Sequence, residues 1–132
     1  GMAHGNKPSV LIVGDLALLH DISGFLLKDK LEGSLTVLVI NNDGGRIFEN
    51  LPIAECEGVP FEECFTTPQS VDIPSMAEGF GWNVQCIHTL DEMEASLQVL
   101  PDQGVSLLHV CTDSTHDVPF RRELFRSVAE SL

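Results

Sequence analysis

The chain has 132 residues, of which 43% are hydrophobic, and this length and composition predict a single domain covering residues 1–132 with a core of ordinary size. Twenty acidic residues against seven basic ones give a formal net charge of −13, which argues against nucleic-acid backbones and anionic membrane surfaces as partners. Its apolar runs are far shorter than the roughly 20 residues needed to span a bilayer. We therefore expect a cytoplasmic protein.

Strand and helix patterns alternate along the first 40 residues. Residues 10–13 and 35–40 are short apolar runs of the kind that form buried strands of a parallel sheet. Between them, residues 16–31 carry apolar side chains at close to helical spacing, and we expect one crossover helix there, with Gly24 as a weak point. A strand, a helix and a second strand within about 30 residues form a βαβ unit, whose two strands end at the same edge of the sheet.

Regular patterns return after residues 46–70, an irregular segment too long for a simple connector and typical of a functional or mobile loop. Thr89 followed by Glu92 is a capping box, which predicts the start of a helix. Asp117 is a candidate N-cap for the last helix, with Pro119 in the first turn, where its missing N–H costs nothing. The other elements expected here are helices at residues 73–80 and 117–131 and strands at 83–88 and 105–111. Four strands alternating with helices predict an α/β fold, a mostly parallel sheet with helices on both faces.

Polar residues follow each of the first two expected strands. Gly14 and Asp15 end the first run, and the cluster after the second run reads Asn41, Asn42, Asp43, Gly44, Gly45. Open α/β sheets bind ligands at this edge, and the oxygens of Asp15 and Asn42 are hard donors suited to Mg²⁺, which would in turn bind a diphosphate. Each side chain could instead cap a neighbouring helix. Their joint spacing, with Gly44 and Gly45 allowing the second turn to bend inward, favours the metal site.

The other reactive side chains point to structural roles. No cysteine belongs to a C-x-x-C pair, so free, mostly buried thiols are expected at Cys56, Cys64, Cys86 and Cys111. His109 and Cys111 alternate along an expected strand and share a face, where core packing is favoured over metal binding. His20 and Asp21 are sequence neighbours near a helix start, so their side chains do not face each other as an acid–base pair would.

At its two polar clusters the chain resembles the thiamine-diphosphate enzymes. The signature of that family is Gly-Asp, a gap of about 25 residues, and Asn-Asn, and here Asn42 lies 27 positions after Asp15. The resemblance implies that Asp15, Asn42 and the main-chain carbonyl of Gly44 bind Mg²⁺, which anchors the diphosphate of thiamine diphosphate. The cofactor-binding residues that it implies are Gly14, Asp15, Leu16, Asn42, Gly44, Gly45 and Ile47.

Further residues narrow the resemblance within that family. Leu16 stands where many members have glycine, Leu19, His20 and Asp21 follow, and residues 41–52 match a longer motif. Together they are similar to the 2-succinyl-5-enolpyruvyl-6-hydroxy-3-cyclohexene-1-carboxylate synthases of menaquinone and phylloquinone biosynthesis. Ile47 and Phe48 match an apolar wall on the substrate side, with packing of a short helix as the alternative, and are expected to make mostly apolar contacts. Arg46 is a candidate for binding substrate carboxylates, although a solvated loop cation is favoured.

The resemblance implies a thiamine-diphosphate-dependent transferase that decarboxylates 2-oxoglutarate and adds the succinyl carbanion equivalent to isochorismate. In the family an activating glutamate comes from an N-terminal pyrimidine-binding domain of the partner subunit, so the full-length enzyme is expected to be a homo-oligomer. We expect this chain to be a C-terminal pyrophosphate-binding fragment that contains no catalytic residue and is inactive alone. Two alternatives stay open: a stand-alone Mg²⁺- or anion-binding α/β module, or another thiamine-diphosphate enzyme such as an acetohydroxyacid synthase or a decarboxylase.

Overall fold

The computed structural model describes residues 3–5 and 7–131. They fall into two compact units. The first unit takes in the chain up to residue 41 together with residues 70–111, and the second takes in residues 42–69 together with residues from 112 onward. Each unit is described separately below.

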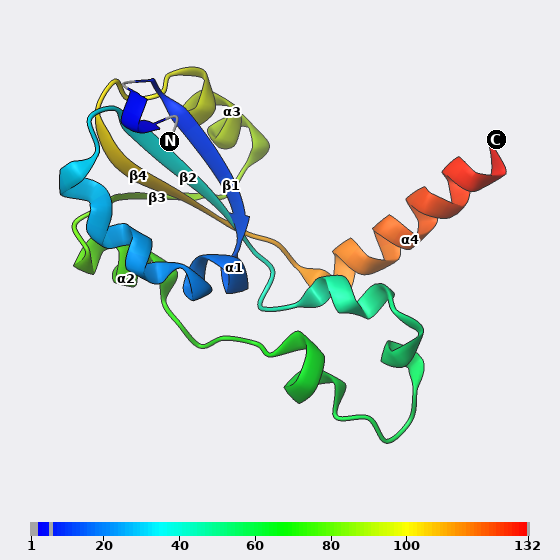
Figure 1. Ribbon diagram of the computed structural model, residues 1–132. Helices are drawn as coiled ribbons and strands as arrows, with labels where there is room; N and C mark the ends of the chain where they lie inside the picture. The colour runs from blue at the N-terminus through cyan, green and yellow to red at the C-terminus, as the bar shows by residue number, and fades with distance from the viewer. Residues whose placement is uncertain (1–2, 6, 132) are drawn as a thin grey trace. The chain divides into compact units, whose positions relative to one another are not determined.

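A four-stranded sheet forms the centre of the first unit (Figure 1). Its strands are β1 (Ser9–Gly14), β2 (Ser34–Asn41), β3 (Asn83–Ile87) and β4 (Gly104–Cys111). They lie in the order β1-β2-β4-β3, and every pairing is parallel. This confirms the predicted α/β fold and its parallel sheet.

Helices cover both faces of this sheet, as the alternating pattern predicted. Side chains of α1 (Asp15–His20), η2 (Ile22–Lys30) and α2 (Ile73–Gly79) pack on one face, where Val37 and Val39 of β2 lie. Helix α3 (Leu90–Gln98) packs on the other face, against Leu38 and its neighbours (Figure 1). A short turn, η1 (Ala3–Gly5), precedes β1.

The predicted crossover helix at residues 16–31 is wrong in one respect, because it is broken in two. Helix α1 ends at His20, and the next segment, η2, is a 3₁₀ helix. The break lies at Asp21, whose N–H donates to the carbonyls of both Ala17 and Leu18, at 3.3 and 3.1 Å. The N–H of Gly24 then bonds to the Asp21 carbonyl at 2.8 Å, an i to i+3 bond that starts the tighter helix.

Side-chain caps begin the later helices of the first unit. Thr89 Oγ1 accepts the N–H of Glu92 at 3.2 Å, as the capping box predicted, while the Glu92 carboxylate accepts the N–H of His88 at 2.8 Å. Asp72 caps α2 by accepting the N–H of Ser75 at 3.1 Å. Each cap satisfies a backbone donor that the first helical turn leaves unpaired.

The second unit contains three short helical turns and one long helix. The turns are η3 (Arg46–Asn50), η4 (Pro52–Glu55) and η5 (Glu62–Thr66), and the helix is α4 (Ser114–Glu130). The predicted N-cap at Asp117 is wrong, since Asp113 caps α4 by accepting the N–H of Thr115 at 2.9 Å. Pro119 therefore lies inside the helix.

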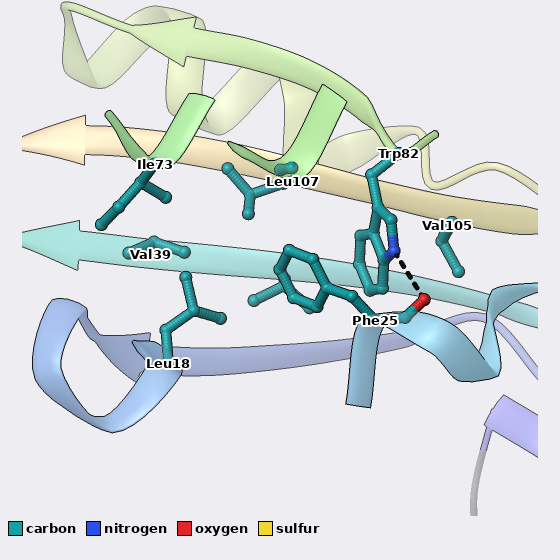
Figure 2. Close-up of a cluster of buried hydrophobic side chains, with 9 residues drawn as sticks. Leu18, Phe25, Val39, Ile73, Trp82, Val105 and Leu107 are labelled. Carbon is teal, nitrogen blue, oxygen red and sulfur yellow. Dashed lines mark hydrogen bonds between the residues drawn. The ribbon is translucent and has the colours of Figure 1, made fainter. Parts of the chain in front are cut away.

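The core of the first unit centres on two aromatic rings. Trp82 stacks on Phe25 with ring centroids 4.3 Å apart, and the indole N–H donates to the Phe25 carbonyl at 3.2 Å (Figure 2). Leu18, Val39 and Leu107 fill the space beside them (Figure 2). This packing joins η2 to the turn before β3, segments 57 residues apart in the chain.

The expectation of mostly buried thiols is wrong. Cys56, Cys64, Cys86 and Cys111 are free but exposed. Cys86 lies on the edge strand β3 and Cys111 is the last residue of β4, where the sheet offers little cover. Among residues 3–5 and 7–131, no helix is both long and apolar enough to cross a membrane.

We expect Trp82→Ala to destabilise the first unit by about 3–5 kcal/mol, the usual cost of truncating a buried large aromatic residue. The change removes the ring stacked on Phe25 and leaves the Phe25 carbonyl without its indole donor. Because Trp82 is the only tryptophan, urea unfolding should be followed by far-ultraviolet circular dichroism. Leu90→Ala, at a side chain that is 77% exposed, is the control and should cost well under 1 kcal/mol. Equal losses in the two variants would contradict this view of the core.

Candidate functional site

Asp15 lies where β1 passes into α1. It is the first residue of that helix and only 3% exposed, which is unusual for a carboxylate. Its Oδ1 accepts the N–H of Leu16 at 2.9 Å. A buried carboxylate needs such compensation, because burial removes the water that would otherwise stabilise its charge. The local sequence therefore holds a negative charge at the carboxyl end of β1.

The register of the sheet sets Asp15 beside the end of β2. Gly14 pairs with Ile40, so Asp15 leaves β1 at the level where Asn41 ends β2. Asn42 is the next residue along the chain. Strands β1 and β2 therefore end at the same carboxyl edge of the sheet, as the βαβ pattern predicted, and bring Asp15 and Asn41 to that edge.

Asn41 is held by a buried histidine on the neighbouring strand. Its amide Nδ2 lies 3.1 Å from Nε2 of His109, a residue of β4 that is 7% exposed. Since the amide nitrogen can only donate, Nε2 accepts, and the imidazole is neutral. Burial lowers the pKa of His109, with the charge of Asp72 partly offsetting that effect, so the neutral ring is also the electrostatically favoured form.

The same edge is hollowed into a cavity of about 400 Å³, at the ends of β2, β3 and β4. Asn41, Asp72, His88 and His109 are among its lining residues. Cys111 also lines it, and although this residue is exposed overall, partial desolvation of its thiol raises the pKa, as does the charge of the nearby Cys86. Within the described part of the chain, no group of three or more His, Cys, Asp or Glu side chains is arranged to hold a metal ion.

Residues 42–45 form a tight turn in the second unit. Gly44 has a φ of 107°, in the left-handed region, and a Cβ at this position would lie 2.1 Å from the carbonyl oxygen of Thr66. The N–H of Gly45 donates to that same oxygen at 2.6 Å. The Gly44 carbonyl accepts the N–H of Arg46 at 2.9 Å. Only glycine fits this turn.

Arg46 is not the solvated loop cation that was expected. Its side chain is 15% exposed and lies 2.8 Å from Glu49 and 2.9 Å from Glu62, with Asp43 at 3.6 Å. Burial acts to lower the pKa of Arg46, but the hydrogen bonds and charges of the two glutamates outweigh it and raise that pKa. A substrate carboxylate would have to compete with these acids for the guanidinium group.

Ile47 and Phe48 are exposed within the described residues. Ile47 is 66% exposed and Phe48 is 40% exposed, although the Phe48 ring meets Phe65 edge-on at 6.2 Å. The expectation of mostly apolar contacts stays a prediction for Ile47. The aromatic contact joins η3 to η5, so this part of the second unit has a small apolar cluster of its own.

The predicted site residues are divided between the two units. Gly14, Asp15 and Leu16 belong to the first, whereas Asn42, Gly44, Gly45, Ile47 and Phe48 belong to the second. Sequence reasoning missed that His109 binds Asn41 and that Thr66 anchors the glycine turn. The alternation of His109 with Cys111 indicated a shared face, but the partner of His109 depends on the register between β2 and β4.

We expect the first unit to lose stability as the pH falls from about 6.5, the ordinary pKa of histidine. The pKa of His109 is lowered in the folded state, so the unfolded chain binds the proton more readily. Acidification below about pH 6.5 therefore favours unfolding, and the full stability is present above that pH. Thermal unfolding at a series of pH values measures this. His109→Gln should flatten the dependence between pH 5 and 7, whereas His88→Gln, at an exposed histidine, should not. An unchanged slope in His109→Gln would contradict the assignment.

Gly44→Ala is expected to disrupt the turn, because the added Cβ meets the Thr66 carbonyl and φ is strained. Strain of this kind costs about 1–3 kcal/mol, so hydrogen exchange at Gly45 should become about ten-fold faster or more. Gly24→Ala, where a Cβ would meet nothing within 4 Å, is the matched control. Equal hydrogen-exchange rates of the Gly45 amide in the two variants would show that the turn does not depend on glycine at position 44.

A family model described as thiamine pyrophosphate enzyme, C-terminal TPP binding domain, matches residues 1–110. The chain is also similar to 2-succinyl-5-enolpyruvyl-6-hydroxy-3-cyclohexene-1-carboxylate synthases. It is 47% identical to that of Synechococcus elongatus over 129 residues, which is 98% of this chain and 22% of the relative. It is 41% identical to that of Acaryochloris marina over 132 residues, 100% of this chain and 22% of the relative. The chain therefore spans about a fifth of the length of these relatives.

Solved structures with low sequence identity share the fold. Benzoylformate decarboxylase from Polynucleobacter necessarius matches with a TM-score of 0.65 and 22% identity, over 83% of this chain and 20% of that one. The thiamine diphosphate-dependent 4-hydroxybenzoylformate decarboxylase of Rhodococcus jostii RHA1 matches with a TM-score of 0.59 and 19% identity, over the same shares. On the family match over residues 1–110, the chain belongs to the thiamine pyrophosphate enzymes, as part of their C-terminal TPP binding domain.

Proposed function

We propose that this chain supplies the Mg²⁺- and diphosphate-binding part of a thiamine-diphosphate site. The observation that carries the proposal is the register of β1 and β2, which brings Asp15 to the level of Asn41, the residue before Asn42. The side chains of Asp15 and Asn42 and the carbonyl of Gly44 would hold the metal. Family membership supports the cofactor, and the order of these residues supports the metal.

The chemistry of the donors fits a magnesium diphosphate. Asp15 contributes a buried carboxylate, Asn42 a neutral amide oxygen, and Gly44 a main-chain carbonyl oxygen. All are hard oxygens, which Mg²⁺ prefers, and only one carries charge, so the metal keeps positive charge for a diphosphate. Gly14 offers open space at the strand end, since a Cβ there would meet nothing within 4 Å.

The remaining predicted residues would surround the cofactor. Gly14, Leu16 and Gly45 would approach it through their backbone, and Ile47 would lie against it. The exposed side chains of Ile47 and Phe48 would form the wall on the substrate side. Their exposure supports this role, because apolar groups in contact with a cofactor or substrate need not be covered by this chain's own residues.

The longer protein would be a synthase acting in the cytoplasm in menaquinone or phylloquinone biosynthesis. Its substrates would be 2-oxoglutarate and isochorismate, and its working form a homo-oligomer in which an N-terminal pyrimidine-binding domain completes each site. Bound thiamine diphosphate would supply the electron sink for decarboxylation. The present residues would hold the diphosphate, orient the cofactor and present an apolar wall. What supports these details is the identity to the synthases over nearly the whole chain.

The test is a charge-matched pair of variants in a full-length synthase carrying this segment. Asp15→Asn should lower carbon dioxide release from 2-oxoglutarate ~100-fold or more, because substitution even outside the ligand shell of a metal commonly costs 10–100-fold. The apparent affinity for Mg²⁺ should fall in parallel. Asp21→Asn removes the same charge at an exposed position close by and should leave both nearly unchanged. His20→Ala should retain part of the activity.

Two results would contradict the proposal. One is equal carbon dioxide release by the Asp15→Asn and Asp21→Asn variants of the full-length synthase at limiting Mg²⁺. The other is this chain alone releasing carbon dioxide from 2-oxoglutarate with cofactor and Mg²⁺. Saturable binding of Mg²⁺ and inorganic diphosphate that depends on Asp15, in a full-length protein without synthase activity, would instead indicate a binding module.

A further inference from the structure

Two contacts join the glycine turn, residues 42–45, to the short helical turn η5. The N–H of Gly45 donates to the carbonyl of Thr66, the last residue of η5, at 2.6 Å. The guanidinium group of Arg46 donates to the carboxylate of Glu62, the first residue of η5, at 2.9 Å. Two consecutive residues therefore hold both ends of one helical turn, the first through its backbone and the second through its side chain.

The turn η5 is itself an unusual element. The N–H of Thr67 donates to the carbonyl of Glu62 at 2.8 Å, five residues back, which is the hydrogen bond of a π helix. Single π turns are rare and occur frequently at functional sites. Thr66 is completely buried, and its hydroxyl donates to the Phe61 carbonyl at 3.4 Å. The glycine turn is therefore attached to a closely packed part of the second unit.

The backbone is strained at both sides of this junction. Asp43, just before Gly44, has a φ of 61°, and Thr67, just after η5, has a φ of 44°. Thr67 is β-branched, and for such a residue the left-handed region is a genuine outlier. Strained residues persist only where the surrounding structure holds them, and they cluster at sites that bind ligands. The contacts made by Gly45 and Arg46 supply that constraint.

Arg46 is surrounded by more acidic groups than one cation needs. Its Nη1 donates to Glu49 at 2.8 Å as well as to Glu62, and Asp43 lies 3.6 Å from Nη2. Its Nε is buried and has no hydrogen-bond partner among the described residues. A buried donor without a partner costs free energy, so this cluster is better explained by what it positions than by stability alone.

The backbone of Arg46 also contacts Gly44 directly. Its N–H donates to the Gly44 carbonyl at 2.9 Å, so the orientation of that carbonyl follows the position of residue 46. That position is fixed in turn by the side-chain contacts with Glu49 and Glu62. A continuous set of contacts within the second unit therefore runs from η5 through Arg46 to the Gly44 carbonyl.

We propose that Arg46 is a positioning residue for the metal. By binding Glu62 it holds the glycine turn on η5 and keeps the Gly44 carbonyl in the orientation that binds Mg²⁺. The proposal rests on the proposed function, because it takes this carbonyl as a metal ligand. Groups that orient a metal ligand commonly change metal affinity about 10–100-fold when they are replaced.

The competing role for Arg46 is direct binding of a substrate carboxylate. Glu49 and Glu62 already accept hydrogen bonds from Nη1, and a substrate would have to displace them. The two roles set different affinities. A positioning residue sets the affinity for Mg²⁺, whereas a substrate-binding residue sets the KM for 2-oxoglutarate or isochorismate.

The first measurement uses a full-length synthase carrying this segment. Arg46→Gln should raise the Mg²⁺ concentration for half-maximal carbon dioxide release about ten-fold and leave kcat at saturating Mg²⁺ within about two-fold. Arg46→Lys keeps the charge but loses the planar group that binds two acids, and it should recover part of the affinity. Arg126→Gln removes the same charge from an exposed ion pair with Glu123 and should change the affinity less than about two-fold.

The second measurement needs neither metal nor activity. In this chain alone, hydrogen exchange of the Gly45 amide should be about ten-fold faster in both Arg46→Gln and Glu62→Gln. The double variant should exchange no faster than Arg46→Gln, because both changes remove one interaction. If Arg46→Gln unfolds the second unit, Glu62→Gln carries both measurements, since Arg46 then keeps its contact with Glu49.

Three results would overturn the proposal. The first is an unchanged Mg²⁺ affinity in Arg46→Gln and Glu62→Gln. The second is a raised KM for 2-oxoglutarate or isochorismate in Arg46→Gln at unchanged Mg²⁺ affinity, which would assign substrate binding to Arg46. The third is Gly45 exchange that is alike in Arg46→Gln and Arg126→Gln.

Failure of this proposal can be told from failure of the proposed function by including Asp15→Asn. If Mg²⁺ affinity depends on Asp15 but not on Arg46, only the positioning role is lost. If it depends on neither, the metal site is lost and the positioning role with it. Gly45 exchange that still depends on Arg46 in that case would show that the contacts with η5 serve the fold of the second unit alone.

Discussion

The parallel pairing of β1 with β2 is the constraint on which the rest of the first unit depends. It sets Gly14 opposite Ile40, so that the two strands end at one level and deliver Asp15 and Asn41 to the same edge. A slip of one residue would turn every β2 side chain to the opposite face and would remove Val37 and Val39 from the cluster that packs against α1, η2 and α2. The burial of the core and the position of the motif are therefore fixed by the same register.

Within each unit the protein holds polar groups by neutral contacts or by contacts between opposite charges. The uncharged ring of His109 binds the Asn41 amide, Leu16 donates its N–H to Asp15, and Arg46 is surrounded by acids of its own unit. These arrangements fix backbone segments without committing a free charge.

The first unit is well packed at one side and open at the other. The stacked pair Phe25 and Trp82 joins η2 to the turn before β3, and α3 covers the interior of the second face. Toward β1, by contrast, aliphatic side chains stay exposed and a cavity stays open.

The sequence by itself determined the class of the fold, the number of strands and their places along the chain, and the motif at the strand ends. These depend on local features, namely apolar runs, capping residues such as Thr89, and the spacing of Asp15 and Asn42. The sequence did not determine where helices break or begin. The break at Asp21 and the start at Asp113 depend on hydrogen bonds that form in the folded chain.

Only the tertiary structure decided the pairing of Asn41 with His109, the hydrogen bond from Gly45 to the Thr66 carbonyl and the exposure of β1. Each of these depends on residues far apart in the sequence or on the order of strands in the sheet. Sequence periodicity reports which face a side chain occupies, but not which strand lies beside it. That neighbour is set by register and strand order, which are properties of the whole sheet.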